Sequence, residues 1–451
     1  MKISEIAALL KVEYRGDDVE FEGAAIDSRQ VEENNLFIAL PGRQVDGNTF
    51  VSAAKAAGAS AAIVTAYQAC ELPQILVKDS QKALRQLAAD YRQKFHLPVV
   101  AITGSCGKTT AKNMLASIFR EASSTLANKG TYNNELGVSW MLMGLRKYHE
   151  YAVFELGANH KGEIADLVKL VKPCCAAVTM VAPVHLEGFG HVDDIAQAKS
   201  EIYEGLPSDG IAIINADDEY CDYFIKKAGN RRKIFFGKEK KADVIVTDIV
   251  LSQQLQPQFV LHTPEASIPV NMQLVGEHNV MNALVAAACA YAFGITLAQI
   301  KKGIEACKPE IKRLIVHQSK RGTVVIDDSY NANPSSVAAA VKLLAKYSGK
   351  KILVLGDMLE LGDRAVEMHR HIGRLAKEHQ VNLFYGYGEL SKEACLQFGE
   401  NGFHFSDQNT LIANLTHQID AQTTLLVKGS NSMKMWNVVE AILGESSCCT
   451  G

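Results

Sequence analysis

Apolar runs of strand length that alternate with helical patterns constrain the fold of this chain more than any other feature. Between residues 97 and 216 the runs read "LPVVAIT", "YAVFEL", "CCAAVTMV" and "IAIINA". Short continuous apolar runs are typical of strands buried on both faces, and the helices between them provide the crossovers that parallel strands need. The alternation therefore predicts an α/β fold with a parallel sheet.

The pattern divides the 451 residues into three predicted domains. Residues 1–79 include the stretch "FVSAAKAAGASAAIV", which predicts a helix followed by a short strand. A predicted helix at Ser80–Phe95 opens the second domain, 80–310. The third domain, 311–451, repeats the alternation with "TVVID", "KILVLGD", "LFYGYG" and "TTLLVKGS". A chain of this length is expected to form roughly two to four domains.

Composition and charge narrow the classes of partner. Hydrophobic residues make up 47% and charged residues 22% of the chain, and the net charge is −3, as in ordinary soluble proteins. We therefore expect no nucleic-acid partner, and no apolar run approaches the roughly 18 residues of a spanning helix. The N-terminus lacks a basic region followed by a long apolar core, so we expect a cytoplasmic protein. The ten cysteines lack C-x-x-C spacing and are expected to be reduced thiols.

The stretch "AITGSCGKTT" resembles a phosphate-binding loop that is one glycine short, because Ile102 stands where the usual pattern has Gly. The apolar run before it and the apolar stripe of "KTTAKNMLASIFREA" after it predict strand, turn and helix, with Gly104 and Gly107 in the turn. The helix N-terminus would bind a phosphate, Lys108 would reach the terminal phosphates, and Thr109 would ligate Mg²⁺. The alternative is a tight turn with a surface lysine, and the strand–turn–helix context favours the phosphate site.

Polar residues also follow other predicted strands, where the ligand sites of open α/β sheets lie. Glu155 ends "YAVFEL", His185 follows "TMVAP", and Asp327 and Asp328 end the strand in "VIDDSYNANPSS". A carboxylate and an imidazole beside a phosphate loop are compatible with a Mg²⁺ site, although histidine is an uncommon Mg²⁺ ligand. The alternative is structural capping of loops and turns. Lys199 lies in the helical pattern "DIAQAKSEIYEGL" and is expected on this basis to be solvated.

Eight motifs in register resemble the Mur ligase family over essentially the whole chain. They are "TGSCGKTT", "NKGTYNNELGVS", "FELGANHKGEIA", "VHLEGFGHVDDIAQAKSEI", "LVGEHNVMNALVAAA", "DDSYNANPSS", "LGDMLELG" and "LVKGS". In the first motif Cys106 replaces a more usual Asn. The pair "DSYNANP" and "LGDMLELG" resembles the branch of the family that adds D-alanyl-D-alanine to a UDP-N-acetylmuramoyl tripeptide.

The resemblance implies a small N-terminal UDP-binding α/β domain, a central ATPase-like domain with a P-loop and a parallel sheet, and a C-terminal Rossmann-like domain. It implies a monomeric, ATP-dependent, ADP-forming ligase that joins D-alanyl-D-alanine to UDP-N-acetylmuramoyl-tripeptide through an acyl phosphate, in the cytoplasmic synthesis of peptidoglycan precursors. A sister amide ligase of the same fold, such as a tripeptide-forming Mur enzyme or a folylpolyglutamate synthetase, is an alternative that "DDSYNANPSS" disfavours. A non-catalytic nucleotide-dependent switch is another alternative, and it does not need the set of Glu155, His185 and Lys199.

Carrying the family's motifs over position by position implies roles for individual residues. The nucleotide site would comprise Gly104, Ser105, Cys106, Gly107, Lys108, Thr109, Thr110, Asn279, Arg313 and Asp327. The sites for the UDP-linked substrate and the dipeptide would comprise Asp27, Ser28, Arg29, Gly42, Asp46, Asn133, Asn134, Tyr330 and Asn331. Mg²⁺ would be held by Thr109, Glu155, His185 and an N-carboxylated Lys199. The catalytic residues would be Lys108, His185 and Lys199.

Two departures from the family's pattern concern other positions. Asn48 stands where the family often has His, and Asn431 and Trp436 stand where Arg and Glu are typical. The second departure bears on the contacts of that C-terminal loop and leaves the phosphate chemistry unaffected.

Overall fold

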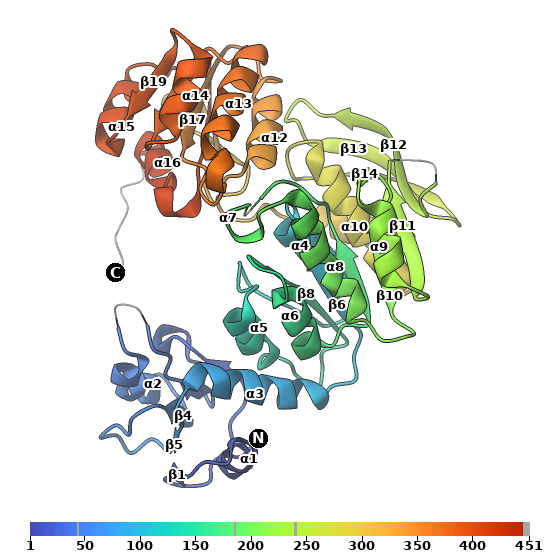
Figure 1. Cartoon of the computed structure of the whole chain (residues 1–451), viewed down its shortest axis with the longest axis vertical. Coiled ribbons are helices and arrows are strands. Elements are labelled where there is room, and N and C mark those ends of the chain that lie inside the picture. Colours follow the sequence, from blue (N-terminus) through green and yellow to red (C-terminus); the bar gives the residue numbers. More distant parts are fainter. Residues whose placement is uncertain (43–44, 185, 239–240, 445–451) are drawn as a thin grey trace.

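The computed structural model describes residues 1–42, 45–184, 186–238 and 241–444. Three sheets follow one another along the chain, and the parts built on them are here called the N-terminal, central and C-terminal domains. Figure 1 shows these domains stacked in chain order, from blue through green and yellow to red. The predicted α/β class is confirmed.

The N-terminal domain has a five-stranded sheet in the order β1-β5-β4-β3-β2. Its strands are β1 (Tyr14–Arg15), β2 (Ala24–Ala25), β3 (Leu36–Ile38), β4 (Ala61–Val64) and β5 (Gln74–Leu76), with only the β1–β5 pair antiparallel. Its helices are α1 (Ile3–Leu10) and α2 (Val51–Ala56), with short 3-10 turns η1 (Ser28–Gln30) and η2 (Gly47–Phe50). The predicted helix and strand of the Ala-rich stretch are therefore confirmed as α2 and β4.

Helix α3 (Ser80–Gln93) joins the N-terminal and central domains, as its position in Figure 1 shows. Asp79 caps its N-terminus by accepting hydrogen bonds from the backbone of Gln81 and Lys82. At its other end the buried Arg92 guanidinium donates to the carbonyls of Val171 (2.7 Å) and Lys172 (3.1 Å) in the central domain. The core beneath α3 continues from one domain into the other.

The central sheet has nine strands in the order β14-β13-β12-β11-β10-β9-β6-β8-β7. The predicted strands are confirmed as β6 (Val99–Thr103), β8 (Tyr151–Glu155), β9 (Cys175–Val178) and β10 (Ile211–Asn215). The sequence reading missed β7 (Thr125–Ala127), β11 (Arg232–Gly237), β12 (Val244–Leu251), β13 (Pro257–His262) and β14 (Ser267–Asn271). The last two pair antiparallel, and their burial alternates or is partial, so they show no continuous apolar run.

Helices cover both faces of the central sheet. One face packs against α4 (Lys108–Arg120), α10 (His278–Ala292) and α11 (Leu297–Ala306). The other face packs against α5 (Glu135–Leu142), α6 (Glu163–Val171), α8 (Val192–Glu204) and α9 (Cys221–Ala228). The short helix α7 (Leu186–Phe189) lies toward the C-terminal domain (Figure 1), where the Glu187 N–H donates to the Glu360 carbonyl (3.3 Å).

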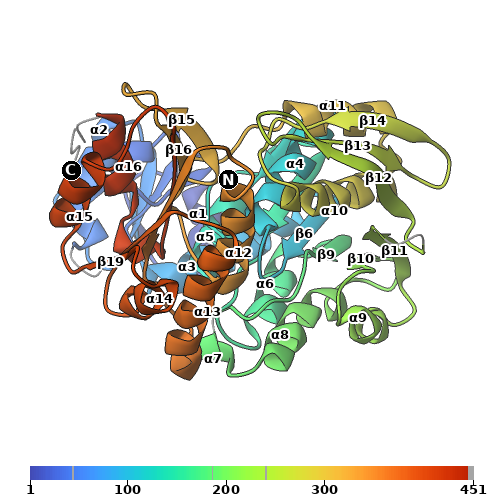
Figure 2. The ribbon, with the colours of Figure 1, turned by 90° about the horizontal axis from the view of Figure 1, so that it is seen from above.

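The C-terminal domain has a six-stranded sheet in the order β15-β16-β20-β17-β18-β19. Its strands are β15 (Ile315–Gln318), β16 (Val324–Asp328), β17 (Lys350–Gly356), β18 (Leu383–Tyr387), β19 (Gly402–Phe405) and β20 (Thr423–Lys428), and only β15 runs antiparallel. Helices α12 (Pro334–Leu344), α13 (Ala365–Glu378) and α14 (Ser391–Phe398) cover one face. Helices α15 (Gln408–Thr416) and α16 (Trp436–Leu443) cover the other, as Figure 2 shows from above. Helices on both faces of a mostly parallel sheet agree with the expected Rossmann-like domain.

Two further expectations concern the chain as a whole. All cysteines in the described residues are free thiols, as predicted. Within the same residues, no helix is both long enough and apolar enough to cross a membrane.

Candidate active site

A cleft of about 1130 Å³ lies between the central and C-terminal domains. Its walls are the loop between β6 and α4, the carboxyl ends of neighbouring strands, the start of α10 and the loop that follows β16. Among the predicted site residues, those that line it are Ser105, Cys106, Gly107, Lys108, Thr109, Thr110, Asn133, Asn134, Glu155, Asn279, Arg313, Tyr330 and Asn331. The structure therefore brings most of the predicted nucleotide and metal residues to one place.

Two glycines shape the loop between β6 and α4. Gly104 has φ 145°, and a Cβ atom there would lie 1.9 Å from Thr179 Oγ1. Gly107 caps α4 with φ 81°, and a Cβ atom there would lie 2.1 Å from Asn282 Oδ1. Left-handed backbone and close neighbours both exclude a larger side chain. Position 102, where the usual pattern has glycine, lies before this turn. Ile102 is a fully buried residue of β6, so the turn does not require a glycine there.

The segment that follows β9 holds this loop in place. Thr179 Oγ1 donates to the carbonyl of Cys106 (2.6 Å), and the Ser105 N–H donates to the carbonyl of Met180 (2.8 Å). Ser105 Oγ donates to the carbonyl of Ala182 (3.0 Å). The first N–H groups of α4 have no carbonyl within their own helix, and with the helix dipole they form an anion site.

Lys108 folds over the same loop. Its Nζ donates to the carbonyls of Gly104 (2.7 Å) and Ser105 (3.4 Å). Burial lowers the pKa of Lys108, the Glu155 carboxylate opposes this shift, and Arg313 adds to it. An anionic phosphate is the group that would best compensate these positive charges.

Glu155 provides a buried carboxylate at the cleft. It ends β8 and is 1% exposed. Its Oε1 accepts a hydrogen bond from Asn133 Nδ2 (2.7 Å), whereas Oε2 is buried and has no hydrogen-bond partner. A buried carboxylate oxygen without a donor suits a cation. Within the described part of the chain, no three His, Cys, Asp or Glu side chains cluster as a preformed metal cage.

Lys199 lies on the buried side of α8 and is 1% exposed, so the expectation of a solvated lysine is wrong. Its Nζ lies 5.6 Å from the centre of the Phe189 ring. Burial first, and then the charge of Lys108, lowers the pKa of Lys199 to about 7. Lys199 is close enough to Lys108 to feel its charge but does not line the cleft. The fourth predicted metal ligand, His185, lies outside the described residues.

The C-terminal domain contributes an arginine, a tyrosine and a buried ion pair. The Arg313 guanidinium lies 4.4 Å from the centre of the Tyr330 ring, and the Tyr330 hydroxyl donates to Thr131 Oγ1 across the cleft (2.7 Å). Asp328 lines the cleft and pairs with Lys428 Nζ at 2.5 Å. Burial raises the pKa of Asp328, and Lys428 opposes this shift.

The predicted nucleotide residue Asp327 lies next to the cleft but does not line it. Its Oδ1 accepts hydrogen bonds from the backbone N–H (3.1 Å) and the hydroxyl (2.5 Å) of Ser329. Successive strand residues point to opposite faces, so Asp327 and Asp328 have different surroundings. Asp327 here shapes the turn that follows β16.

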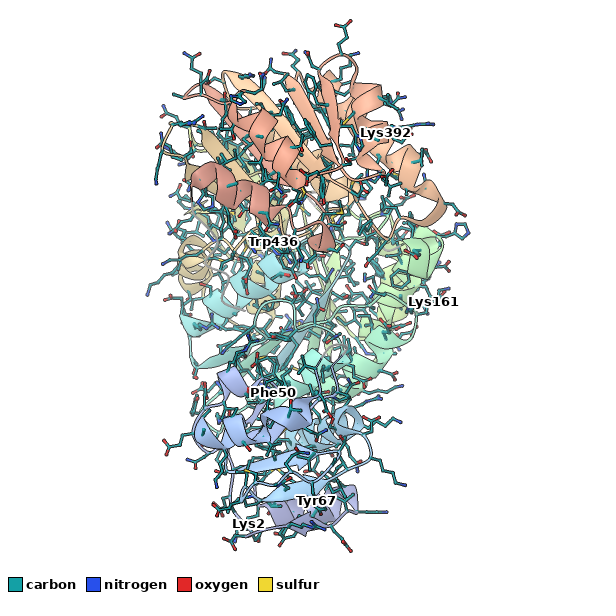
Figure 3. The ribbon with its side chains drawn as sticks, turned by 90° about the vertical axis from the view of Figure 1, so that its left-hand side faces the viewer. Lys2, Phe50, Tyr67, Lys161, Lys392 and Trp436 are labelled. Atoms are coloured by element: carbon teal, nitrogen blue, oxygen red, sulfur yellow. The ribbon has the colours of Figure 1, made fainter. Side chains whose placement is uncertain are left out.

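The predicted substrate residues of the N-terminal domain lie apart from this cleft. They comprise Asp27, Ser28, Arg29, Gly42 and Asp46, and none of these described residues is part of its lining. Asp27 caps η1 and accepts a hydrogen bond from Arg29 Nη2 (2.8 Å). Asp46 caps η2 and accepts from Asn48 Nδ2 (2.8 Å). Figure 3 labels Phe50 at the end of η2, on the side of this domain that faces the central domain.

Several residues that line the cleft were not predicted from the sequence. Asn282 Nδ2 donates to Asn279 Oδ1 (2.9 Å) and so orients the Asn279 side chain, which is predicted to contact the nucleotide. Its spacing of three from Asn279 in "EHNVMNA" is a helical signal that could have revealed it. Asn113 Nδ2 donates to Glu310 Oε2 (2.6 Å) across the link to the C-terminal domain, which no local pattern indicates.

Asn431 and Trp436, which depart from the family's pattern, also lie near this region. Asn431 Nδ2 donates to the Tyr330 carbonyl (3.0 Å). The Trp436 ring lies 3.9 Å from Lys312 Nζ, and Figure 3 labels it at the lower part of the C-terminal domain. Both side chains therefore contact segments that flank the cleft.

The chain is similar to known proteins over most of its length. Residues 20–92, 102–290 and 312–431 match the profiles described as Mur ligase family, catalytic domain; Mur ligase middle domain; and Mur ligase, glutamate ligase domain. The UDP-N-acetylmuramoyl-tripeptide–D-alanyl-D-alanine ligase of Escherichia coli (strain K12) is 39% identical over 449 residues, which is 99% of each chain. The ligase of the same name from Bacillus subtilis (strain 168) is 31% identical, with 98% of each chain covered.

Solved structures are also similar to this chain over most of its length. A crystal structure of MurF from Acinetobacter baumannii matches with a TM-score of 0.88 and 36% identity over 98% of each chain. The MurF ligase of Thermotoga maritima in complex with ADP matches with a TM-score of 0.78 and 25% identity, covering 94% of this chain and 97% of that one.

Proposed function

The chain belongs to the Mur ligase family, and from this membership we propose that it joins D-alanyl-D-alanine to a UDP-N-acetylmuramoyl tripeptide in an ATP-dependent, ADP-forming reaction. The observation that carries the proposal is the 39% identity over 99% of both chains with the E. coli ligase of that name. This reaction is a step in the synthesis of peptidoglycan. Its need for ATP favours a cytoplasmic location.

The chemistry requires activation of the tripeptide carboxylate, because a carboxylate does not react with an amine near neutral pH. In the proposed first step the carboxylate oxygen attacks the γ-phosphorus, and the bond between that phosphorus and ADP breaks. The neutral amine of D-alanyl-D-alanine then attacks the acyl carbon and a C–N bond forms. The bond between that carbon and the phosphate oxygen breaks, inorganic phosphate leaves, and the nitrogen releases a proton to solvent. Lys108 and the N-terminus of α4 stabilise the negative charge on the phosphoryl oxygens during the first step.

Exclusion of water is the second requirement, because water would hydrolyse an acyl phosphate. The cleft is bounded by two domains, and the Tyr330–Thr131 hydrogen bond joins them at its edge. Arg313 reaches the cleft from the C-terminal side. We infer that the C-terminal domain completes the site and shields the intermediate.

The residues present fit a magnesium ion at the phosphate loop. The Oε2 atom of Glu155 is buried without a donor, and Thr109 lines the same cleft as Glu155. Thr109 and Glu155 would hold the ion, which when bound would neutralise charge on the phosphate oxygens. Asn133 orients the Glu155 carboxylate from the opposite side.

We also propose that Lys199 is N-carboxylated and, with His185, serves a second Mg²⁺. Support comes from its burial and from a pKa of about 7, which leaves an appreciable fraction of the amine neutral and able to react with CO₂. A carbamate would convert a buried cation into an oxygen ligand.

The UDP group is proposed to bind the N-terminal domain at Asp27, Ser28, Arg29, Gly42 and Asp46. We propose domain boundaries of 1–79, 80–310 and 311–451, because each range contains one complete sheet. We further propose that the enzyme acts as a monomer, because both domains that line the cleft belong to one chain.

The experiment that tests this function measures phosphate release from ATP with defined UDP-muramoyl tripeptides. We expect release that depends on both the tripeptide and D-alanyl-D-alanine, with formation of the UDP-linked pentapeptide detected by mass spectrometry. Release with a single amino acid as acceptor, and none with the dipeptide, would indicate a sister amide ligase. Nucleotide binding without release under any of these conditions would indicate a switch.

A further inference from the structure

A second buried lysine lies behind the phosphate loop, and the proposed chemistry does not use it. Lys112 follows Lys108 by one turn of α4 and is 1% exposed. Its Nζ donates to the carbonyl of Asn128 at 2.6 Å. Burial lowers the pKa of Lys112, and the nearby Glu155 carboxylate opposes this shift. Burial of a charged ammonium group lowers the stability of the fold unless its contacts compensate for the lost hydration, so the contacts of Lys112 indicate what it does.

Asn128 connects this lysine to Glu155. Asn128 follows β7 and is 1% exposed. Its Oδ1 accepts from the Glu155 N–H (2.9 Å), and its Nδ2 donates to the Glu155 carbonyl (3.2 Å) and the Tyr132 carbonyl (2.9 Å). One amide therefore holds both backbone groups of Glu155 and also the segment that leads to Asn133.

The same segment orients the carboxylate. Asn133 Nδ2 donates to Glu155 Oε1 (2.7 Å), and this leaves Oε2 free of donors. The backbone of Glu155 and one of its two carboxylate oxygens are thus held by residues 128–133, and Lys112 holds the start of that segment.

We propose that Lys112 is a positioning residue which, through Asn128, holds Glu155 so that its Oε2 atom faces a divalent cation at the nucleotide site. The inference rests on the proposed function only for the presence of that cation. Partners behind a metal ligand fix its orientation, and their loss typically weakens metal binding by about tenfold or more.

Whether replacing Lys112 weakens or tightens cation binding distinguishes a positioning role from a purely electrostatic one. The Lys112 charge by itself repels a cation held by Glu155, so removing the charge alone would tighten cation binding. Removing a positioning contact would weaken it. A merely structural role would lower the melting temperature and leave the affinity of the folded protein for the cation unchanged.

The test compares wild type, Lys112→Met and Lys112→Arg by three measurements on the full chain. These are Mn²⁺ affinity of the ADP complex by electron paramagnetic resonance, ADP affinity in EDTA, and the thermal unfolding midpoint. We expect Lys112→Met to weaken Mn²⁺ binding about tenfold. We expect ADP affinity in EDTA to change much less, and Lys112→Arg, which keeps a donor, to recover most of the Mn²⁺ affinity.

Arg92→Met is the matched control, because Arg92 is also a buried cation that donates to carbonyls. Its partners are the carbonyls of Val171, Phe95 and Lys172, which do not belong to the segment that holds Glu155. It should lower the unfolding midpoint without changing Mn²⁺ affinity. Asn128→Ser breaks the contact with Glu155 while keeping the carbonyl that Lys112 needs, and should weaken Mn²⁺ binding as Lys112→Met does. If Lys112→Met does not fold, unchanged Mn²⁺ binding in Asn128→Ser still overturns the inference, because the proposed path from Lys112 to Glu155 runs through Asn128.

Unchanged or tighter Mn²⁺ binding in Lys112→Met or in Asn128→Ser would overturn the inference. A wild type that binds ADP and Mn²⁺ but does not form the pentapeptide would overturn the proposed function and leave the inference intact.

Discussion

At the scale of single residues, Lys108 carries the clearest expectation. Its ammonium bonds two carbonyls of its own loop and lies where phosphate oxygens would compete for it. We predict that Lys108→Ala lowers the ligation rate by more than about tenfold, because such electrostatic contacts contribute several kcal/mol in phosphoryl transfer. Circular dichroism should show an intact fold. A folded variant with more than roughly a tenth of the wild-type rate would contradict the assigned role.

Lys199 gives a prediction with a pH dependence. CO₂ reacts only with the neutral amine, and an ordinary lysine with a pKa of about 10.4 has little of it at neutral pH. Burial lowers the pKa of Lys199 to about 7, so the neutral fraction rises as pH increases through that value. In buffers with limiting bicarbonate, activity should therefore rise from acidic to mildly alkaline pH.

The companion variant tests the carbamate directly. Lys199→Ala should be inactive and should regain activity with added formate or acetate, which supply the missing oxygens. The assay is phosphate release with and without these acids. Full activity of the variant without any additive would rule out a metal-binding carbamate at Lys199.

At the scale of secondary-structure elements, the turn between β6 and α4 depends on close contact with the segment after β9. Gly104→Ala would place a Cβ atom 1.9 Å from Thr179 Oγ1, so either the loop or that segment must move. We predict at least about tenfold weaker ADP binding by calorimetry, the order of effect expected when a preorganised binding loop shifts. Gly162→Ala is the control, because Gly162 also has a positive φ (89°) but no neighbour within 4 Å. Equal ADP affinities in the two variants would show that crowding at Gly104 is unimportant.

At the scale of the whole molecule, the domains differ in whether their hydrophobic cores include residues from a neighbouring domain. The two core clusters of the C-terminal domain consist of residues from that domain alone. The N-terminal domain has one small cluster of its own, on the side of its sheet that packs against α2. Its other cluster is shared, because Ile3, Ile6 and Leu36 belong to one cluster with Leu84 and Leu87 of α3. We predict that a fragment of residues 311–451 unfolds cooperatively in urea, whereas a fragment of residues 1–79 does not.

Circular dichroism during urea titration of both fragments is the measurement. A cooperative transition in the fragment of residues 1–79 would show that α3 is dispensable for that core. It would also support the proposed boundary at residue 79 as a true folding boundary.

Features that depend on neighbours along the chain were predictable from the sequence. The strand β6, the glycine turn and α4 were predictable because a buried run, glycine conformations and a helical stripe are local signals. The same holds for the apolar strands of the C-terminal sheet. The strands β13 and β14 were not predicted, because partly exposed antiparallel strands lack a continuous apolar run.

Which of these residues contact one another depends on how the helices and strands pack together. Lys199 lies on a helix of mixed polarity, and its burial depends on what packs against that helix. Asp327 and Asp328 are adjacent, and the packing of β16 decides that Asp328 faces the cleft. The path from Lys112 through Asn128 to Glu155 joins α4, the end of β7 and the end of β8. Such contacts arise from the order of strands in a sheet, which no local pattern of residues encodes.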